Sequence, residues 1–184
     1  FSLCSRSTGT AHTIFLLDAS GSMRATDAEP SRFDEAAARL SSSIGILAAD
    51  EGHRFSVLAV GALPQIEVAR QSSPAGILPI LEGLRAGDGP ADWEAAVPLV
   101  ASLVRSGETT AIVVLTDASN AASGRIAEAF PGLSISHERF AGTATANAGL
   151  TAEVTAGEAA GNWRIRGSVL FGGAEPNEVT VSAW

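Results

Sequence analysis

Hydrophobic residues in the first three quarters of the chain follow two alternating patterns. Short apolar runs at 13–17, 54–60 and 110–115 have the length and aliphatic content of buried parallel strands. The stretches between them place apolar residues three or four positions apart, which is the pattern of an amphipathic helix. The helices that this spacing predicts cover 32–49, 74–84, 93–106 and 124–130. We therefore expect an α/β fold built on a mostly parallel sheet.

Two shorter strands complete the predicted sheet. The run at 65–70 follows a Gly-Ala-Leu-Pro turn, so we expect a short antiparallel strand at the sheet edge. The run at 133–137 follows the last predicted helix, and the strand at 110–115, the most apolar of all, is expected to be central. Ser31 and Asp92 precede helical patterns and are predicted to cap those helices. In the second helix, the residues expected on the buried side are Ile77, Leu78, Leu81 and Leu84.

The hydrophobic pattern changes near residue 145. From there apolar and polar residues alternate at 150–155, 163–169 and 179–184, with Gly-rich and Asn-rich turns between them. This is the pattern of antiparallel strands. We therefore predict two parts, an α/β domain at 1–144 and a short antiparallel β segment at 145–184. Three strands are few for an independent core, so the segment is expected either to dock on the first domain or to begin a truncated β-sandwich.

Composition removes several classes of function. The chain of 184 residues carries a net charge of −8, which disfavours nucleic acid and anionic membrane surfaces as partners. All twelve basic residues are arginine, so a Schiff-base lysine and a phosphate-binding Walker lysine are excluded. No apolar run approaches the length of a membrane-spanning helix. Phe1 is not a natural first residue, and we expect the chain to be part of a longer protein.

Candidate chemistry lies where two predicted strands end. Asp18, Ser20 and Ser22 directly follow the strand at 13–17, and Asp117 follows the strand at 110–115. If these parallel strands are neighbours, both loops open on the edge of the sheet where ligands bind in α/β folds. Two carboxylates and two hydroxyls are hard oxygen donors, which suit Mg²⁺ or Mn²⁺. The sequence therefore predicts a metal site at this edge.

The same residues carry a resemblance to a known family. The segment Asp18-Ala19-Ser20-Gly21-Ser22-Met23 resembles the metal-ion-dependent adhesion site of the von Willebrand factor type A (vWA) domain. The segment Val113-Val114-Leu115-Thr116-Asp117 is similar to a later metal-site loop of that family, and the resemblance covers about 12–140. It implies a Rossmann-like, three-layer fold. It also implies that Ser20 and Ser22 bind the metal directly, that Asp18 and Asp117 act through water, and that a partner protein supplies an Asp or Glu to the remaining position.

The middle loop departs from the family pattern. The family has a Gly-Thr pair there, with the threonine hydroxyl on the metal, whereas this chain reads Gly89-Pro90-Ala91-Asp92. Ala91 takes the threonine position and cannot ligate a metal. Asp92 is a candidate substitute ligand, with helix capping as its alternative role. The affinity of the site for metal is therefore expected to be reduced.

A second departure follows the strand at 133–137. Typical vWA domains add a further helix and strand there, whereas this chain enters its alternating β pattern. The junction is similar to bacterial membrane-anchored vWA proteins of the aerotolerance-regulator type. That similarity implies the soluble part of a bacterial membrane-anchored protein, with membrane contact only through flanking segments absent from these residues.

Three functions stay open. The first is a non-enzymatic, metal-dependent protein-interaction module without a small-molecule substrate. The second is a structural scaffold with a vestigial metal site, which Ala91 motivates. The third is a phosphatase with Asp18 as nucleophile; it is disfavoured because Ser20 stands where such enzymes have a second Asp, and because no lysine is present.

The histidines are not expected to take part in any of these sites. His12, His53 and His137 are far apart in sequence, and we assign them to the lead-in, a helix-to-strand loop and a strand end. The chain has a single cysteine, Cys4. Together these observations argue against a zinc site.

Overall fold

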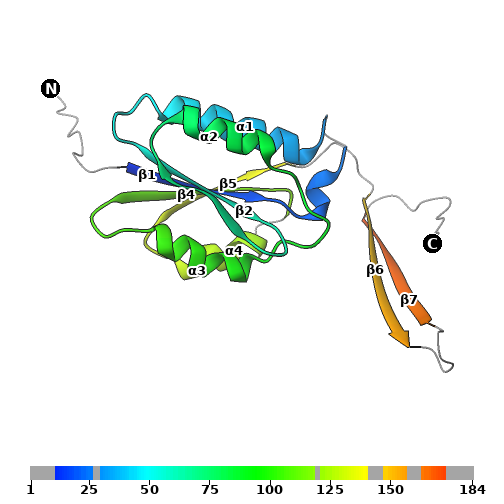
Figure 1. Ribbon diagram of the computed structural model, residues 1–184. Coiled ribbons are helices and arrows are strands. Elements are labelled where there is room, and N and C mark those ends of the chain that lie inside the picture. The colour runs from blue at the N-terminus through cyan, green and yellow to red at the C-terminus, as the bar shows by residue number, and fades with distance from the viewer. Residues whose placement is uncertain (1–10, 27–29, 119–120, 141–146, 157–162, 173–184) are drawn as a thin grey trace. The chain divides into compact units, whose positions relative to one another are not determined.

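The structure is a computed structural model that describes residues 11–26, 30–118, 121–140, 147–156 and 163–172. The chain divides into two compact units, Phe1–Gly142 and Thr143–Trp184, and each is described by itself (Figure 1). Among the described residues, no helix has both the length and the apolar character needed to cross a membrane.

The first unit is organised around a five-stranded sheet with the order β3-β2-β1-β4-β5. Neighbouring strands are parallel except for β2 and β3, which are antiparallel at the sheet edge, as predicted. The central strand, β1, buries apolar side chains on both of its faces, which is typical of a strand covered by helices on both sides. The strands are β1 (Ala11–Asp18), β2 (Arg54–Val60), β3 (Gln65–Gln71), β4 (Thr109–Thr116) and β5 (Ser134–Arg139).

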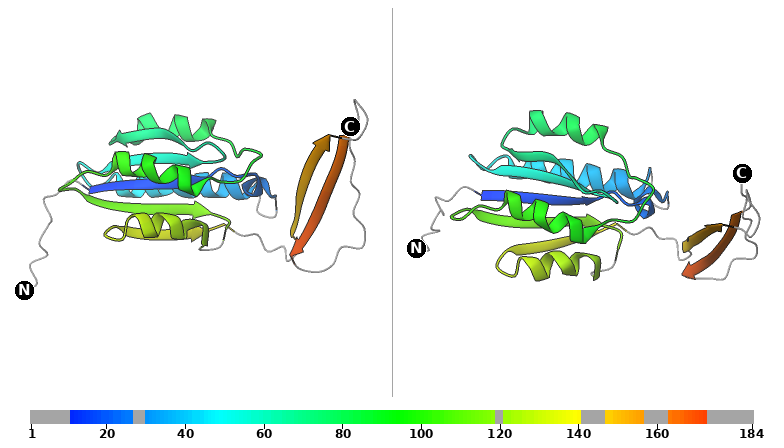
Figure 2. Two further views of the ribbon diagram at one scale, coloured as in Figure 1. Left: turned by 90° about the horizontal axis from the view of Figure 1, so that it is seen from below. Right: turned by 60° about the horizontal axis from the view of Figure 1, so that its bottom comes forward.

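Helices cover both faces of this sheet and complete a three-layer, Rossmann-like fold. Helices α1 (Arg32–Leu47) and α2 (Pro74–Gly83) lie on one face, and α3 (Trp93–Leu103) and α4 (Ala121–Ala129) lie on the other (Figure 1). The views from below show α3 and α4 together against the same face (Figure 2). Consecutive residues of β1 divide between two apolar clusters: Phe15 packs on the α1–α2 side and Leu16 on the α3 side.

Local signals predicted most helix ends within a few residues. Ser31 caps α1, because its Oγ accepts a hydrogen bond from the Asp34 amide at 3.1 Å. The predicted buried side of α2 was wrong at one position, because Leu78 is 36% exposed, whereas Ile80 packs against the core. A short 3₁₀ helix, η1 (Gly21–Arg24), was not predicted, although Met23 within it is fully buried.

The described part of the second unit is a two-stranded antiparallel sheet. Strand β6 (Asn147–Ala156) pairs with β7 (Trp163–Gly172) in continuous register, which agrees with the alternating pattern of this region. The third strand predicted there, at 179–184, lies outside the described residues.

Candidate metal centre

Asp18 is the last residue of β1 and is only 1% exposed. Its Oδ1 accepts a hydrogen bond from the Ser20 amide at 2.9 Å, and its Oδ2 accepts one from Thr116 Oγ1 at 2.5 Å. Because β1 and β4 are parallel neighbours, the ends of both strands meet at this carboxylate. Burial and two donors hold Asp18 in one orientation.

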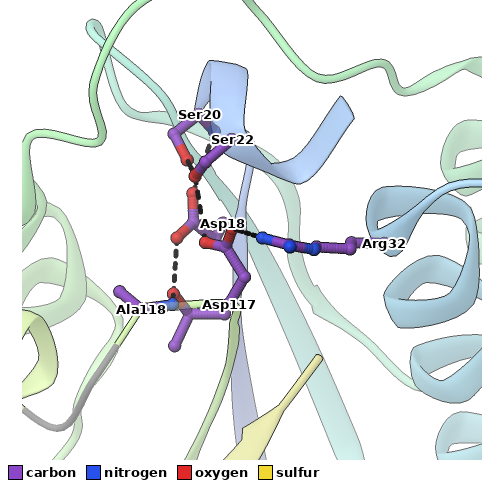
Figure 3. A network of polar contacts seen from close by, with 7 residues as sticks. Asp18, Ser20, Ser22, Arg32, Asp117 and Ala118 are labelled. Atoms are coloured by element: carbon purple, nitrogen blue, oxygen red, sulfur yellow. Dashed lines mark hydrogen bonds and ion pairs between the residues drawn. The ribbon is translucent and has the colours of Figure 1, made fainter. Parts of the chain in front are cut away.

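Two hydroxyls lie beside this carboxylate. Ser20 Oγ and Ser22 Oγ are 3.1 Å apart, and Ser22 Oγ donates to Asp117 Oδ1 at 3.0 Å (Figure 3). Thr116 Oγ1 also accepts a hydrogen bond from the Ala118 amide at 3.0 Å, which shapes the loop that carries Asp117. The structure therefore brings Asp18, Ser20, Ser22 and Asp117 together at the carboxyl ends of β1 and β4.

Backbone contacts place a third loop against this site. The Gly21 amide donates to the Gly89 carbonyl at 2.9 Å, and the Gly87 amide donates to the Ala19 carbonyl at 2.8 Å. A Cβ atom on Gly21 would lie 3.0 Å from the Asp88 carbonyl oxygen. Glycine at position 21 therefore permits the close approach of the two loops.

The third loop offers no side-chain oxygen at the position where the family has threonine. Ala91 is partly buried and packs against the apolar cluster on the α3 side. Asp92 is exposed, and its Oδ1 accepts a hydrogen bond from the Ala95 amide at 2.9 Å, which caps α3. Within the described part of the chain, no hydrogen bond joins Asp92 to the site formed by Asp18, Ser20, Ser22 and Asp117. Metal ligation by Asp92 stays a prediction, and the observed contact supports the capping role.

One residue of the site was missed by the sequence analysis. Arg32, the first residue of α1, donates from Nη1 to Asp117 Oδ2 at 2.6 Å. The side chains of Arg32 and Asp117 are only 12% and 6% exposed. A sequence signal was available, because a cation in the first turn of a helix opposes the helix dipole and calls for a specific partner.

The residues present fit a small divalent cation. Two adjacent ligands of an ideal octahedral Mg²⁺ site, each about 2.1 Å from the ion, lie about 3.0 Å apart. The distance of 3.1 Å between Ser20 Oγ and Ser22 Oγ matches this separation. The described residues contain no group of three or more His, Cys, Asp and Glu side chains suited to a metal. The candidate site therefore depends on hydroxyls together with two carboxylates.

A sequence model of the von Willebrand factor type A domain family matches residues 13–120. The chain belongs to this family. The match includes the Asp18 loop and Asp117, and it confirms the resemblance inferred from those residues. A search of curated protein sequences found no match.

Solved structures support the vWA fold. An aerotolerance-related membrane protein from Bacteroides fragilis is 20% identical and gives a TM-score of 0.62, with 89% of this chain and 81% of that chain covered. The conserved hypothetical protein BatB from Bacteroides thetaiotaomicron is 23% identical with a TM-score of 0.54, and the match covers 69% of this chain and 65% of that chain. Proximal thread matrix protein 1 from the mussel byssus, a structure with a zinc-occupied MIDAS motif, is 16% identical with a TM-score of 0.51; 70% of this chain and 35% of that chain are covered.

Two histidines lie at the amino-terminal ends of β1 and β2, away from the candidate site at the carboxyl ends. His12 lies within β1 rather than in a lead-in, and its Nε2 is 2.9 Å from Ser56 Oγ. His53 Nε2 is 2.9 Å from Thr13 Oγ1. Arg70 Nη1 donates to His12 Nδ1 at 3.2 Å. Because an arginine can only donate, Nδ1 is the unprotonated nitrogen of His12 and Nε2 carries the proton.

Proposed function

We propose that this vWA domain is a non-enzymatic interaction module that binds Mg²⁺ or Mn²⁺ and recruits a protein partner through an Asp or Glu of that partner. Ser20 and Ser22 would hold the ion directly, and Asp18 and Asp117 would act through water. The observation that carries the proposal is the hydroxyl pair 3.1 Å apart, flanked by two carboxylates at neighbouring strand ends.

Each residue of the candidate site has a defined role in this proposal. Thr116 and the Ser20 amide donate to the two oxygens of Asp18, so this carboxylate is oriented before any ion arrives. Asp117 accepts the hydrogen bond that Ser22 Oγ donates, so the lone pairs of Ser22 Oγ are left to face Ser20. When bound, the ion supplies an open coordination position that a carboxylate can fill.

The surroundings of the hydroxyls support a non-enzymatic role. A serine nucleophile needs a general base within hydrogen-bond distance. Ser20 Oγ contacts Ser22 Oγ, and Ser22 Oγ donates to Asp117, whose second oxygen accepts from Arg32. The buried histidines His12 and His53 bond to residues at the opposite ends of the strands. This arrangement favours cation binding over acyl or phosphoryl transfer.

A scaffold with a vestigial metal site is the second candidate. Two observations favour it: Ala91 offers no ligand, and Arg32 already places a positive charge against Asp117. In this case the partner would use another surface of the domain, and cation removal would not change the interaction.

We further propose that the chain is the non-membrane part of a bacterial membrane-anchored protein, with anchoring segments outside these residues, and that 145–184 belongs to a β domain. The similarity to the Bacteroides fragilis membrane protein supports this. That match covers 89% of the chain, whereas the first compact unit has 142 of the 184 residues. The match therefore extends into the β segment.

Calorimetric titration of Mg²⁺ and Mn²⁺ into metal-free protein tests the proposal. We expect saturable binding that Asp18→Ala abolishes. Asp50→Ala, an exposed carboxylate after α1, removes the same charge away from the site and serves as the control. Binding that survives Asp18→Ala would contradict the assigned ligands. No binding at millimolar concentrations of metal would indicate either the scaffold or a metal site that only its partner completes.

A further inference from the structure

An open groove lies on the surface between the β2–β3 turn and the first turn of α3. Its volume is about 430 Å³, which is within the range of pockets that hold small organic ligands and is ample for one aliphatic side chain. The apolar residues that line the groove are Ala62, Pro90, Ala91 and Trp93. The groove therefore offers an apolar surface that the described residues leave open.

The two walls of this groove are held together by the backbone. The Asp92 amide donates a hydrogen bond to the Gly61 carbonyl at 2.9 Å, so the third loop is fixed to the β2–β3 turn. A Cβ atom on Gly89 would lie 3.1 Å from Ala62 Cβ, which shows how closely the loop and the turn pack. The groove is therefore formed before anything binds, and binding does not have to order its walls.

A strongly exposed apolar side chain lies directly beside the groove. Leu63 follows Ala62 in the β2–β3 turn and is 81% exposed, more than any other large apolar residue that the structure describes. A single exposed leucine is common on protein surfaces. Here, however, the leucine adjoins an open apolar groove, so one surface carries both a projection and a recess. Two copies of such a surface can each bury the leucine of the other.

The charged residues at the rim of the groove carry both signs. Glu94 and Arg125 are 3.9 Å apart, at the limit of an ion pair, and their side chains are 82% and 62% exposed. Water and salt screen such a pair, so each residue can bind an outside charge at little cost. Asp92, the third charged residue of the groove, is engaged as the cap of α3.

This pair of opposite charges makes the rim complementary to itself. A two-fold axis beside the groove can place Glu94 of one copy opposite Arg125 of the other, and the reverse. Two ion pairs would then form across the interface and fix the orientation of the two copies.

We propose that this groove is a self-association site, at which two copies of the chain bind each other with Leu63 of each copy in the groove of the other. A two-fold symmetric interface needs a projection with its recess, and both signs of charge, on the same surface, and this surface has all of them. The interface is small, so we expect a weak dimer. It uses none of the four residues at the candidate metal centre, so the inference is independent of the proposed function.

Analytical ultracentrifugation of the whole chain tests this proposal. Sedimentation is followed from micromolar to millimolar protein in the presence of a chelator, so that no cation takes part. The salt concentration is near physiological, where a Debye length of about 8 Å screens the repulsion between two chains of charge −8. We expect the average mass to rise with protein concentration toward that of a dimer.

The substitution Leu63→Ser removes the projection. We expect it to weaken the dimer roughly a hundredfold, because each copy loses one leucine that the dimer buries. Ile46→Ser is the matched control, since Ile46 is 69% exposed on α1 and does not line the groove. This control removes an exposed aliphatic side chain of the same size, and it should associate like the wild type.

Charge reversal tests the two-fold arrangement. E94R alone and R125E alone should each weaken self-association, because each places like charges opposite each other across the interface. Mixed in equal amounts, the two variants should associate about as tightly as the wild type, because opposite charges then face each other in both pairs. The contact between Glu94 and Arg125 within one chain is lost in both variants, so it cannot produce this recovery. Melting curves verify that each variant is folded.

Three outcomes would overturn the proposal. The first is a wild type that stays monomeric at millimolar concentration. The second is a dimer that L63S and I46S affect equally, because another surface would then hold the copies together. The third is a mixture of E94R and R125E that associates no better than either variant alone. None of these outcomes bears on cation binding, so the proposed function is tested separately.

Discussion

Thr116 on β4 donates its hydroxyl proton to Asp18 at the end of β1, with 2.5 Å between Oγ1 and Oδ2. Both residues are buried, at 3% and 1% exposure. The same oxygen of Thr116 accepts the Ala118 amide. One hydroxyl therefore joins the two strand ends that carry the candidate site and shapes the loop of Asp117.

Removing this hydroxyl tests how much the contact stabilises the fold. We expect Thr116→Val to lower the free energy of unfolding by about 1–3 kcal/mol, because it leaves a buried carboxylate oxygen without its donor. Thr110→Val is the matched control: Thr110 is also buried on β4, and within the described residues its Oγ1 has no hydrogen-bond partner. The substitution Thr110→Val should leave the free energy of unfolding unchanged or raise it. Urea unfolding followed by circular dichroism measures both, and equal losses would contradict the assignment.

Gly21 is a second position at which the structure restricts the residue, because it has no room for a larger side chain. Its absent side chain leaves room for the Asp88 carbonyl, which would lie 3.0 Å from a new Cβ atom. Gly21→Ala should push the third loop away from η1 and weaken the Gly21–Gly89 hydrogen bond. We expect a loss of about 1–3 kcal/mol in the free energy of unfolding, and weaker Mn²⁺ binding.

Gly45 provides the control for that substitution. It lies inside α1, and among the described residues outside the adjacent helix backbone no atom lies within 4 Å of a Cβ atom placed there. Gly45→Ala should raise the free energy of unfolding by about 0.5–1 kcal/mol, because alanine is the better helix former. If Gly21→Ala also stabilised the protein, the close approach of the two loops would be refuted.

The polar network at the other ends of the strands predicts a pH dependence of stability. Burial, followed by the positive charge of Arg70, lowers the pKa of His12 from its ordinary 6.5 to about 4. Glu108 opposes this shift, and His53 and Arg54 add to it. Between those two pH values the unfolded chain binds more protons at this residue than the folded chain does. The free energy of unfolding should therefore fall as the pH drops from about 6.5 to about 4.

Substitution of the histidine separates its contribution from the acid sensitivity of the carboxylates. We expect His12→Gln to reduce the loss of stability between pH 7 and pH 4.5 by roughly 1–3 kcal/mol. His137→Gln, at an exposed position on β5, should leave the loss unchanged. Chemical unfolding at several pH values measures the slopes, and the same slope in His12→Gln and the wild type would exclude His12 as its source.

The parts of the fold that follow from local patterns could be predicted from the sequence. The apolar run of β1, the Ser31 cap and the acidic loop after β1 each depend on neighbouring residues only. The location of Asp18 and Asp117 at one site could also be predicted, because parallel neighbouring strands end at the same edge of the sheet. The family match then confirmed the fold that these signals predict.

The contacts that were missed depend on side chains distant in sequence. Arg32 bonds to Asp117, which is 85 positions away in the sequence, and hydrophobic periodicity does not predict such a contact. Arg70 adopts a positive φ of 53° beside an irregularity in the β2–β3 pairing. That backbone geometry lets its amide donate to Ser56 while its guanidinium reaches His12 and Glu108. A strand pattern gives no sign of such a bulge or of the buried contacts of His12, a residue that the sequence analysis assigns to the lead-in.

Ala91 offers the most direct test of the missing ligand. We expect Ala91→Thr to tighten Mn²⁺ binding about tenfold, because a hydroxyl would take a coordination position that water otherwise fills. Ala91→Val is the matched control, since it has the same branched shape without the oxygen. Ala91 packs against the α3-side cluster, so both variants should disturb that packing alike. Calorimetry of Mn²⁺ measures the difference. An equal change in both variants would trace the effect to packing, whereas a gain in the threonine variant alone would show that the third loop faces the ion.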